Sequence, residues 1–321
     1  MKNSSFIPHH FLHKNLLSDA QTQILSPLRY PGGKGGLSKF LATVLRINNC
    51  VGSCYYEPFA GGAGAAFRLL SNRMVGDLFL NDADPCIYAF WKSALWETER
   101  FVDRTLSIPL TIKEWQRQKD VCFNPSGQSI FDLGFATFYL NRCNRSGIIV
   151  GAGPIGGYAQ NGAWRLDARF NRESLASRIL HLGEYRNSIN IYNLDAITFL
   201  KAHLPKGKKR KDTFVYLDPP YYKAGRRLYL NFYKEEEHRA LAKYILKQRA
   251  LNWVMSYDKS DFISKLYRTC NEYLFLWRYS LQKKQKAEEL LIVPHHLILP
   301  KHKELNKINM NLQSIKGVYS N

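Results

Sequence analysis

The residues most suited to chemistry lie where a hydrophobic stretch, 214–217, runs directly into Asp218-Pro219-Pro220-Tyr221. Prolines lack the N–H groups that a β-ladder needs, so a strand must end there. The carboxylate of Asp218 and a prolyl carbonyl are both acceptors, and together they suit an amino group with two protons to donate. Holding both protons would draw an aromatic amine toward tetrahedral geometry and free its lone pair. The alternative is an ordinary strand exit. The catalytic candidates are Asp218, Pro219, Pro220 and Tyr221.

A glycine-rich turn, 57–64, separates an expected strand from an expected helix. Small residues at a helix N-terminus let the backbone approach a ligand closely. Asp82 ends the next expected strand, about 20 residues further on, where an acid commonly binds ribose hydroxyls. This pairing indicates a cofactor that contains a nucleoside, although a tight strand-to-helix turn is the alternative. The turn candidates are Glu57, Pro58, Phe59, Gly61 and Gly62.

Two further sites fit the same ligand. Asp195 follows a third expected strand, where it could accept from an adenine amino group or simply cap the next helix. An earlier cluster places Tyr30 and Lys34 around Gly32 and Gly33. Its lysine suits a carboxylate or phosphate, and an ordinary surface turn is again the alternative.

The elements that must position these residues alternate between strand and helix. Expected strands cover 54–59, 77–82, 189–193, 214–217 and 252–257, and each is followed by a stretch that reads as a helix. This alternation predicts a Rossmann-like, doubly wound α/β fold with a mostly parallel sheet. Two final apolar runs, at 272–281 and 289–299, lack a helix between them and predict an antiparallel hairpin, which makes seven strands.

The alternation fails over 98–186, which predicts a mainly helical insert. The expected domains are a flexible extension over 1–26, a discontinuous catalytic domain over 27–97 and 187–300, the insert over 98–186, and a polar tail over 301–321.

Composition favours a polyanionic partner. The chain has 321 residues, with 46 Lys and Arg against 26 Asp and Glu, for a net charge of +20. Nucleic acid is the leading candidate for so basic a protein. The six cysteines and nine histidines show no zinc-ligand spacing, so no metal is expected and the thiols fit a reducing cytoplasm. No apolar run reaches the length of a signal peptide or membrane span, which predicts an intracellular protein with no membrane contact.

Four motifs occur in order along the chain: LRYPGGK, EPFAGGAG, LNDAD and YLDPPYY. Together with NRCNRSG they make the chain resemble the Dam-like, alpha-group DNA adenine methyltransferases over residues 26–299. The resemblance implies transfer of a methyl group from S-adenosylmethionine to the 6-amino group of a flipped-out adenine in duplex DNA, with S-adenosylhomocysteine as product and no metal. The setting implied is the cytoplasm of a bacterium, or a phage-encoded protein bound to nucleoid DNA.

The resemblance also assigns roles to residues. Asp218, Pro219 and Tyr221 would hold the amine. The implied cofactor contacts are Tyr30, Gly32, Gly33, Lys34, Glu57, Pro58, Phe59, Gly61, Gly62, Asp82, Asp195 and Asp218.

DNA contacts are expected from the insert and from the segment after the prolines. Arginine to guanine is the commonest specific pairing, although a structural ion pair is an equal alternative for each arginine of the insert. The basic run 206–211 precedes its strand and is expected to be a solvated loop at the opposite sheet edge. The DNA-binding candidates are Asn141, Arg142, Asn144, Arg145, Lys223, Arg226 and Arg227.

Residues 141–147 depart from the pattern typical of this family, because an arginine stands where an aromatic residue is common. A GATC target is therefore not transferred to this chain. Methylation of the cytosine 4-amino group and a cofactor-binding DNA adaptor without turnover remain open alternatives. A companion restriction or defence component is also possible as a partner. The protein is expected to be a monomer or a weak dimer.

Overall fold

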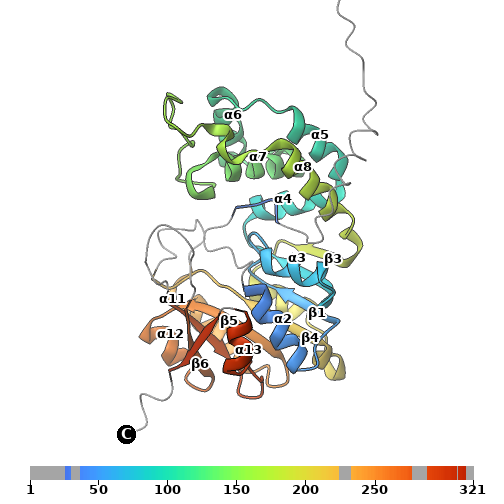
Figure 1. Cartoon of the computed structure of the whole chain (residues 1–321), viewed down its shortest axis with the longest axis vertical. Coiled ribbons are helices and arrows are strands. Elements are labelled where there is room, and N and C mark those ends of the chain that lie inside the picture. Colours follow the sequence, from blue (N-terminus) through green and yellow to red (C-terminus); the bar gives the residue numbers. More distant parts are fainter. Residues whose placement is uncertain (1–25, 30–36, 224–232, 277–287, 309, 316–321) are drawn as a thin grey trace, which may run out of the picture. The chain divides into compact units, whose positions relative to one another are not determined.

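The computed structural model describes residues 26–29, 37–223, 233–276, 288–308 and 310–315. The chain forms two compact units, and each is described by itself (Figure 1). The helical unit comprises Met1–Gly33 and Cys86–Asn187, and the sheet unit comprises Lys34–Pro85 and Ser188–Asn321. The predicted extension over 1–26 lies, except for Ser26, outside the described residues.

The sheet unit is built on a mixed sheet with the order β3-β2-β1-β4-β5-β7-β6-β8. The first five strands in this order are parallel to one another, and β7, β6 and β8 join antiparallel. This confirms the predicted α/β class, the mostly parallel sheet and the terminal hairpin. The strands are β1 (Ser53–Glu57), β2 (Val75–Asn81), β3 (Ile189–Tyr192), β4 (Thr213–Leu217), β5 (Asn252–Asp258), β6 (Asn271–Leu276), β7 (Glu288–Val293) and β8 (Asn311–Ser314).

The predicted count of seven strands was wrong, because the sheet has eight. Strand β8 and the short helix α13 (His302–Lys307) both lie in 301–321, the segment predicted as a polar tail. The sequence Asn-Leu-Gln-Ser has one apolar side chain, so no hydrophobic alternation marks it. What holds β8 is backbone pairing along the edge of β6, where Leu274 lies opposite Gln313.

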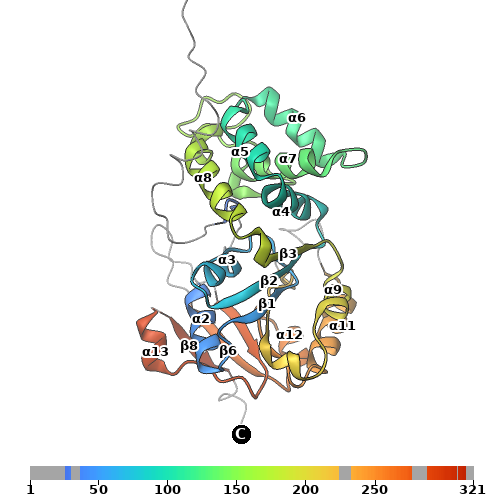
Figure 2. The ribbon, with the colours of Figure 1, turned by 90° about the vertical axis from the view of Figure 1, so that its right-hand side faces the viewer.

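Helices cover both faces of this sheet. Figure 2 shows α9 (Ala196–His203), α11 (Glu235–Leu246) and α12 (Asp261–Leu266) together on one side. Their apolar side chains share one core with sheet residues such as Tyr56, Val215 and Trp253. Helices α2 (Leu37–Ile47) and α3 (Gly64–Ser71) belong to the other side, where Phe40 meets Phe275 of β6 edge-on. Burial on both faces explains why the central strands read as hydrophobic runs.

The sheet reverses its winding between β1 and β4. From β1 the chain continues through α3 to β2 on one side, whereas β4 leads through α11 to β5 on the other. Ligands of doubly wound folds bind at the carboxyl ends of the strands that flank such a reversal.

The helical unit packs around α7 (Ile130–Cys143). Nearly every α7 residue is buried, including Phe131, Phe135 and Phe138. Gly134 permits the close approach of α4, because a Cβ there would lie 2.4 Å from the Ala89 carbonyl oxygen. The other helices of the unit are α4 (Pro85–Trp96), α5 (Thr98–Ser107), α6 (Ile112–Phe123) and α8 (Arg172–Gly183).

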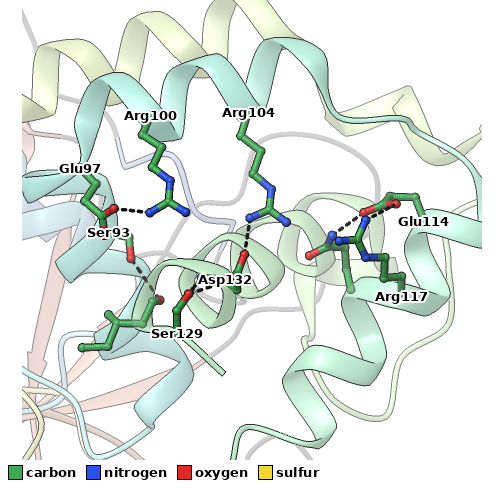
Figure 3. Close-up of polar contacts among 10 residues, drawn as sticks. Ser93, Glu97, Arg100, Arg104, Glu114, Arg117, Ser129 and Asp132 are labelled. Carbon is green, nitrogen blue, oxygen red and sulfur yellow. Dashed lines mark hydrogen bonds and ion pairs between the residues drawn. The ribbon is translucent and has the colours of Figure 1, made fainter. Parts of the chain in front are cut away.

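Polar contacts align α5 with the start of α7 (Figure 3). The Arg104 Nη1 atom lies 2.7 Å from Asp132 Oδ1, and the Ser129 hydroxyl donates to Asp132 Oδ2 at 2.6 Å. The pKa of Asp132 lies below its usual value. The hydrogen bond from the Ser129 hydroxyl is the largest cause, and Arg104 lowers the pKa by a smaller amount. Ser129 also caps α7 by accepting from the Asp132 N–H, which satisfies a free donor of the first turn.

None of the helices in the described part of the chain is both long enough and apolar enough to cross a membrane.

Candidate functional site

One edge of the sheet unit gathers acidic side chains from six neighbouring strands. Each of the five parallel strands has an acid at its carboxyl end or within three residues of it. Strand β7 adds Glu289, which lies opposite Asp258 in the antiparallel register. The six acids, in sheet order, are Asp195, Asp82, Glu57, Asp218, Asp258 and Glu289. Like charges at one edge repel, so this edge suits a cation or hydrogen-bond donors.

The pairing of β1 with β4 brings Glu57 near Asp218. Tyr56 lies opposite Val215 in this parallel ladder, so Glu57 falls opposite Tyr216, two residues before Asp218, and both acids lie at the ends of adjacent strands. Glu57 is only 4% exposed, and its Oε2 atom has no hydrogen-bond partner among the described residues. Burial, and then the charge of Asp218, raise the pKa of Glu57 well above its usual value.

The glycine turn is joined directly to the acid of the next strand. The Gly61 N–H donates to Asp82 Oδ2 at 2.8 Å, and the Asp84 N–H donates to Asp82 Oδ1 at 2.9 Å. Gly61 has a φ of +46°, in the left-handed region that glycine tolerates best. Burial raises the pKa of Asp82 to about 7, although the Asp84 and Gly61 N–H groups oppose the rise.

A buried asparagine fixes three strand ends together. The Asn81 amide donates to the Pro58 carbonyl at 3.0 Å and to the Leu194 carbonyl at 2.9 Å. Its oxygen accepts from the Leu194 N–H at 2.9 Å, and the side chain is fully buried. The glycine turn after β1 and the loop after β3 are therefore both attached to the end of β2. Sequence reasoning missed this residue, although the polar side chain between Leu80 and Asp82 was a visible signal.

Asp195 caps α9. Its Oδ1 atom accepts from the N–H groups of Ile197 and Thr198 at 2.9 and 3.0 Å, which fits the capping alternative. An exposed carboxylate that caps a helix can still accept from a ligand through its second oxygen.

Two aromatic rings stand near these acids. Phe59 packs edge-on against Tyr233, with ring centroids 5.7 Å apart. Burial first, and then the charges of Asp195, Glu237 and Asp82, raise the pKa of Tyr233. Tyr233 thus lies close to two of the edge acids, and sequence reasoning did not identify it.

The segment after β4 is held by the neighbouring strands. Pro219 is buried, and the Tyr221 hydroxyl donates to Glu289 Oε1 at 2.9 Å. The carboxylate of Asp258 accepts from the Tyr222 N–H at 2.8 Å and from the Lys223 N–H at 2.6 Å. Asp258 was not predicted as a site residue, yet it fixes the course of the backbone beyond the two prolines.

The charges at this edge of the sheet indicate which class of cofactor it can bind. The Asp218 carboxylate would repel the phosphates of a dinucleotide, whereas a cationic sulfonium or ammonium group would stabilise both Asp218 and the ionised form of Glu57. Asp82 and Asp195 add acceptors for hydroxyl and amino groups. These acidic acceptors therefore fit a positively charged nucleoside such as S-adenosylmethionine better than a nucleoside phosphate.

Three of the predicted DNA-binding residues are buried inside the helical unit. The Asn141 side chain accepts from the Arg29 N–H at 2.6 Å and donates to the Arg29 and Gly147 carbonyls. Arg142 donates through Nε and Nη2 to the Pro27 carbonyl. Burial first, and then the charges of Arg178 and Arg29, lower the pKa of Arg142 to about 9.

Asn144 is buried in the same way. Its side chain accepts from the Trp115 indole at 2.7 Å and donates to the carbonyls of Ile148 and Ile149. Asn141, Arg142 and Asn144 therefore brace the helical unit, and we do not carry them forward as DNA contacts. The burial of these three side chains results from the packing around α7, and the local sequence does not predict that packing.

The other predicted residues divide into two groups. Arg145 and Lys223 are exposed, as is most of the basic run 206–211. The remaining candidates lie outside the described residues; they are Tyr30, Gly32, Gly33, Lys34, Arg226 and Arg227. The described residues contain no group of three or more His, Cys, Asp or Glu side chains placed to hold a metal ion.

Comparison with known proteins identifies one family. The model of a family described as D12 class N6 adenine-specific DNA methyltransferase matches residues 30–281. No curated protein matches the chain. Among solved structures, protein LPL1258 of Legionella pneumophila strain Philadelphia 1, described under DUF519, is 12% identical and covers 87% of this chain and 90% of its own. Its TM-score of 0.33 is too low to bear on function.

Replacing Asn81 by alanine should destabilise the sheet unit. The change removes the partner of the buried Pro58 carbonyl and of the partly buried Leu194 N–H and carbonyl, so the free energy of unfolding should fall by about 2–4 kcal/mol. Asn72→Ala, at the exposed end of α3, is the matched control and should cost under about 0.5 kcal/mol. Urea unfolding of the two variants measures both, and equal values would contradict the role of Asn81.

Proposed function

The chain belongs to the D12 class N6 adenine-specific DNA methyltransferase family, and on that premise we propose that its acidic sheet edge is the catalytic site. The proposed reaction is methyl transfer from S-adenosylmethionine to the 6-amino group of an adenine that has left the duplex. The observation that carries this proposal is that Asp218 and the buried Glu57 lie close together at the ends of the paired strands β1 and β4. The family favours adenine over cytosine and turnover over a passive adaptor.

Residues of β1 to β3 would bind the cofactor. Phe59 and Tyr233 offer apolar ring surface for its adenine, and Asp195, whose charge acts on Tyr233, would accept from the amino group. Asp82 would accept from the ribose hydroxyls, in a position fixed by the Gly61 N–H. Glu57, Pro58, Gly61 and Gly62 would surround the methionine part. Tyr30, Gly32, Gly33 and Lys34 stay cofactor-binding predictions that come from the sequence alone.

Residues of β4 would hold the target base. The carboxylate of Asp218 and the Pro219 carbonyl would accept the two amine protons, and Tyr221 would stack on the ring. Glu289 fixes the Tyr221 hydroxyl, and Asp258 fixes the main chain after Tyr221. The cofactor supplies an activated methyl group on a positively charged sulfur. Unstacking the adenine costs a few kcal/mol, which stacking on Tyr221 would partly offset.

DNA would contact the loop 148–165 of the helical unit. Trp164 is 70% exposed and Tyr158 is 63% exposed, which is unusual for aromatic side chains unless they meet a partner. Gln160 braces the loop, since its amide donates to the carbonyls of Ile155 and Gly157 and its oxygen accepts from the Leu166 N–H. Exposed arginines flank the loop at 145, 165 and 169. Rigid aromatic and cationic side chains together suit stacking on bases and contact with phosphates.

This loop replaces the three buried residues as the proposed DNA contact. Arg145 reaches toward it, because a Cβ on Gly157 would lie 3.8 Å from the Arg145 Nη2 atom. Lys223, exposed beside the prolines, together with Arg226 and Arg227, would contact phosphates near the target base.

Substituting Asp218 by alanine should abolish methylation. The wild-type protein, incubated with duplex DNA and labelled S-adenosylmethionine, should yield N6-methyladenine after digestion to nucleosides. Loss of the carboxylate removes the acceptor for the amine, so we expect a decrease of about 100-fold or more. Near-normal activity of Asp218→Ala would exclude the proposed amine-binding role, and 4-methylcytosine as the product would favour the cytosine alternative.

Cofactor affinity should depend on the ionisation of Asp82. Burial raises its pKa to about 7, and only the ionised carboxylate accepts from both ribose hydroxyls. The dissociation constant of S-adenosylmethionine should therefore rise as the pH falls from 8.5 to 6, which calorimetric titration measures. Asp82→Asn should bind more weakly and lose this dependence. An unchanged pH profile in Asp82→Asn would show that another group titrates.

Removing the aromatic side chain of Trp164 should weaken DNA binding without affecting the cofactor. Stacking contributes about 1–3 kcal/mol per base, so Trp164→Ala should raise the dissociation constant of duplex DNA roughly 5- to 100-fold. Trp96→Ala is the matched control, since Trp96 is also exposed, at the end of α4. Fluorescence anisotropy gives both values, and equal effects of the two variants would exclude loop 148–165 as a specific contact.

A further inference from the structure

A chain of hydrogen bonds connects Asp218 to two side chains that the proposed function leaves unused. The Ser256 hydroxyl donates to Asp218 Oδ1 at 2.6 Å. The Tyr216 hydroxyl lies 2.8 Å from the Ser256 Oγ atom. Ser256 is 2% exposed and Tyr216 is fully buried, so water is excluded from the bond between these two hydroxyls, whereas Asp218 is partly exposed.

The register of β4 and β5 produces this arrangement. Leu217 lies opposite Met255, so the next position along each strand brings Asp218 beside Ser256. Tyr216 is two residues before Asp218 and therefore points to the same face of the sheet. The three side chains form a short row across two neighbouring parallel strands.

The direction of the bonds is fixed by the chemistry of the groups. An ionised carboxylate only accepts, so the single Ser256 proton goes to Asp218. Tyr216 must then donate to Ser256. Burial, and then the charge of Asp218, raise the pKa of Tyr216 well above its usual value, so its hydroxyl keeps the proton at any working pH. The row is thus a one-way series of donors that ends on Asp218.

A hydrogen-bond donor matters at Asp218 because a second acid lies close by. The buried carboxyl group of Glu57 is near enough for the two acids to influence each other's ionisation. An amine clamp must be an ionised acceptor with a fixed orientation, since a protonated carboxyl would offer its own proton to the amine. A hydrogen bond from Ser256 favours the ionised form and fixes the plane of the carboxylate.

We infer that Ser256, supported by Tyr216, is a positioning residue that keeps Asp218 ionised and oriented for the amine of the target base. This inference rests on the proposed function for its catalytic consequence, and on the described hydrogen bonds for its physical basis. A serine that served stability alone would change the melting temperature and leave the ionisation of Asp218 unaltered.

Two variants remove the donors one at a time. Ser256→Ala should lower kcat for DNA methylation about 10- to 100-fold, with the KM values for DNA and cofactor nearly unchanged. Tyr216→Phe, which acts through Ser256, should lower kcat in the same direction by a smaller factor. In both variants the acidic limb of the kcat–pH profile should move to higher pH, because the ionised form has lost a donor. Ser71→Ala and Tyr244→Phe, elsewhere in the sheet unit, are the matched controls.

A second readout does not depend on turnover. Carbon-13 NMR of carboxyl-labelled aspartate, with the Asp218 signal identified by its loss in Asp218→Asn, follows ionisation in the ligand-free protein. The titration midpoint should move to higher pH in Ser256→Ala and, less far, in Tyr216→Phe. An unchanged midpoint in both variants overturns the inference. The inference is also overturned if Ser256→Ala has the same kcat as the wild-type protein and the same acidic limb in its kcat–pH profile.

The two readouts separate this inference from the proposed function. A wild-type protein that transfers no methyl group to DNA contradicts the proposed function, while the NMR titration still decides the role of Ser256. If Ser256→Ala does not fold, Tyr216→Phe removes only one oxygen atom and decides the question by the same titration.

Discussion

The parallel pairing of β1 with β4 is the constraint on which the site depends. It brings two carboxyl groups, Glu57 and Asp218, to the end of adjacent strands in the buried centre of the sheet. Burial, and then the charge of Asp218, favour the protonated form of Glu57. The two acids differ in their surroundings. Asp218 accepts a hydrogen bond from Ser256, whereas Glu57 has a raised pKa. A cationic ligand would supply the remaining compensation.

The distribution of charge separates two tasks. A chain with 20 more basic than acidic residues concentrates six acids along one sheet edge. The basic excess suits the DNA phosphates, and the acidic edge suits a positively charged cofactor and an amino group. Backbone donors hold several of these acids in place, as with the Gly61 N–H on Asp82 and the Tyr222 and Lys223 N–H groups on Asp258. The acids are therefore fixed before any ligand arrives.

Sequence patterns predicted the parallel part of the sheet because its strands are buried on both faces and are separated by helices of distinct periodicity. They also placed Glu57, Asp82, Asp195 and Asp218 at one edge, since the carboxyl ends of parallel strands meet there. Strand β8 was missed because its stability comes from backbone pairing rather than from apolar side chains.

The side chains that support the site could not be found in this way. Ser256, Asn81 and Asp258 act through partners distant in the sequence, and nothing in their local sequence names those partners. The burial of Asn141, Arg142 and Asn144 was equally hidden from the local sequence. Their residue types suit DNA, but packing around α7 buries them against the chain's own carbonyl groups.

The central claim is that this sheet edge methylates adenine in DNA. Its most direct test is single-molecule sequencing of DNA from a methylation-free host that expresses the protein, with a host expressing Asp218→Ala beside it. The account predicts N6-methyladenine in a defined sequence context with the wild-type protein and none with the variant. Unmodified DNA despite folded, cofactor-binding protein, or the same modification with both proteins, would contradict it.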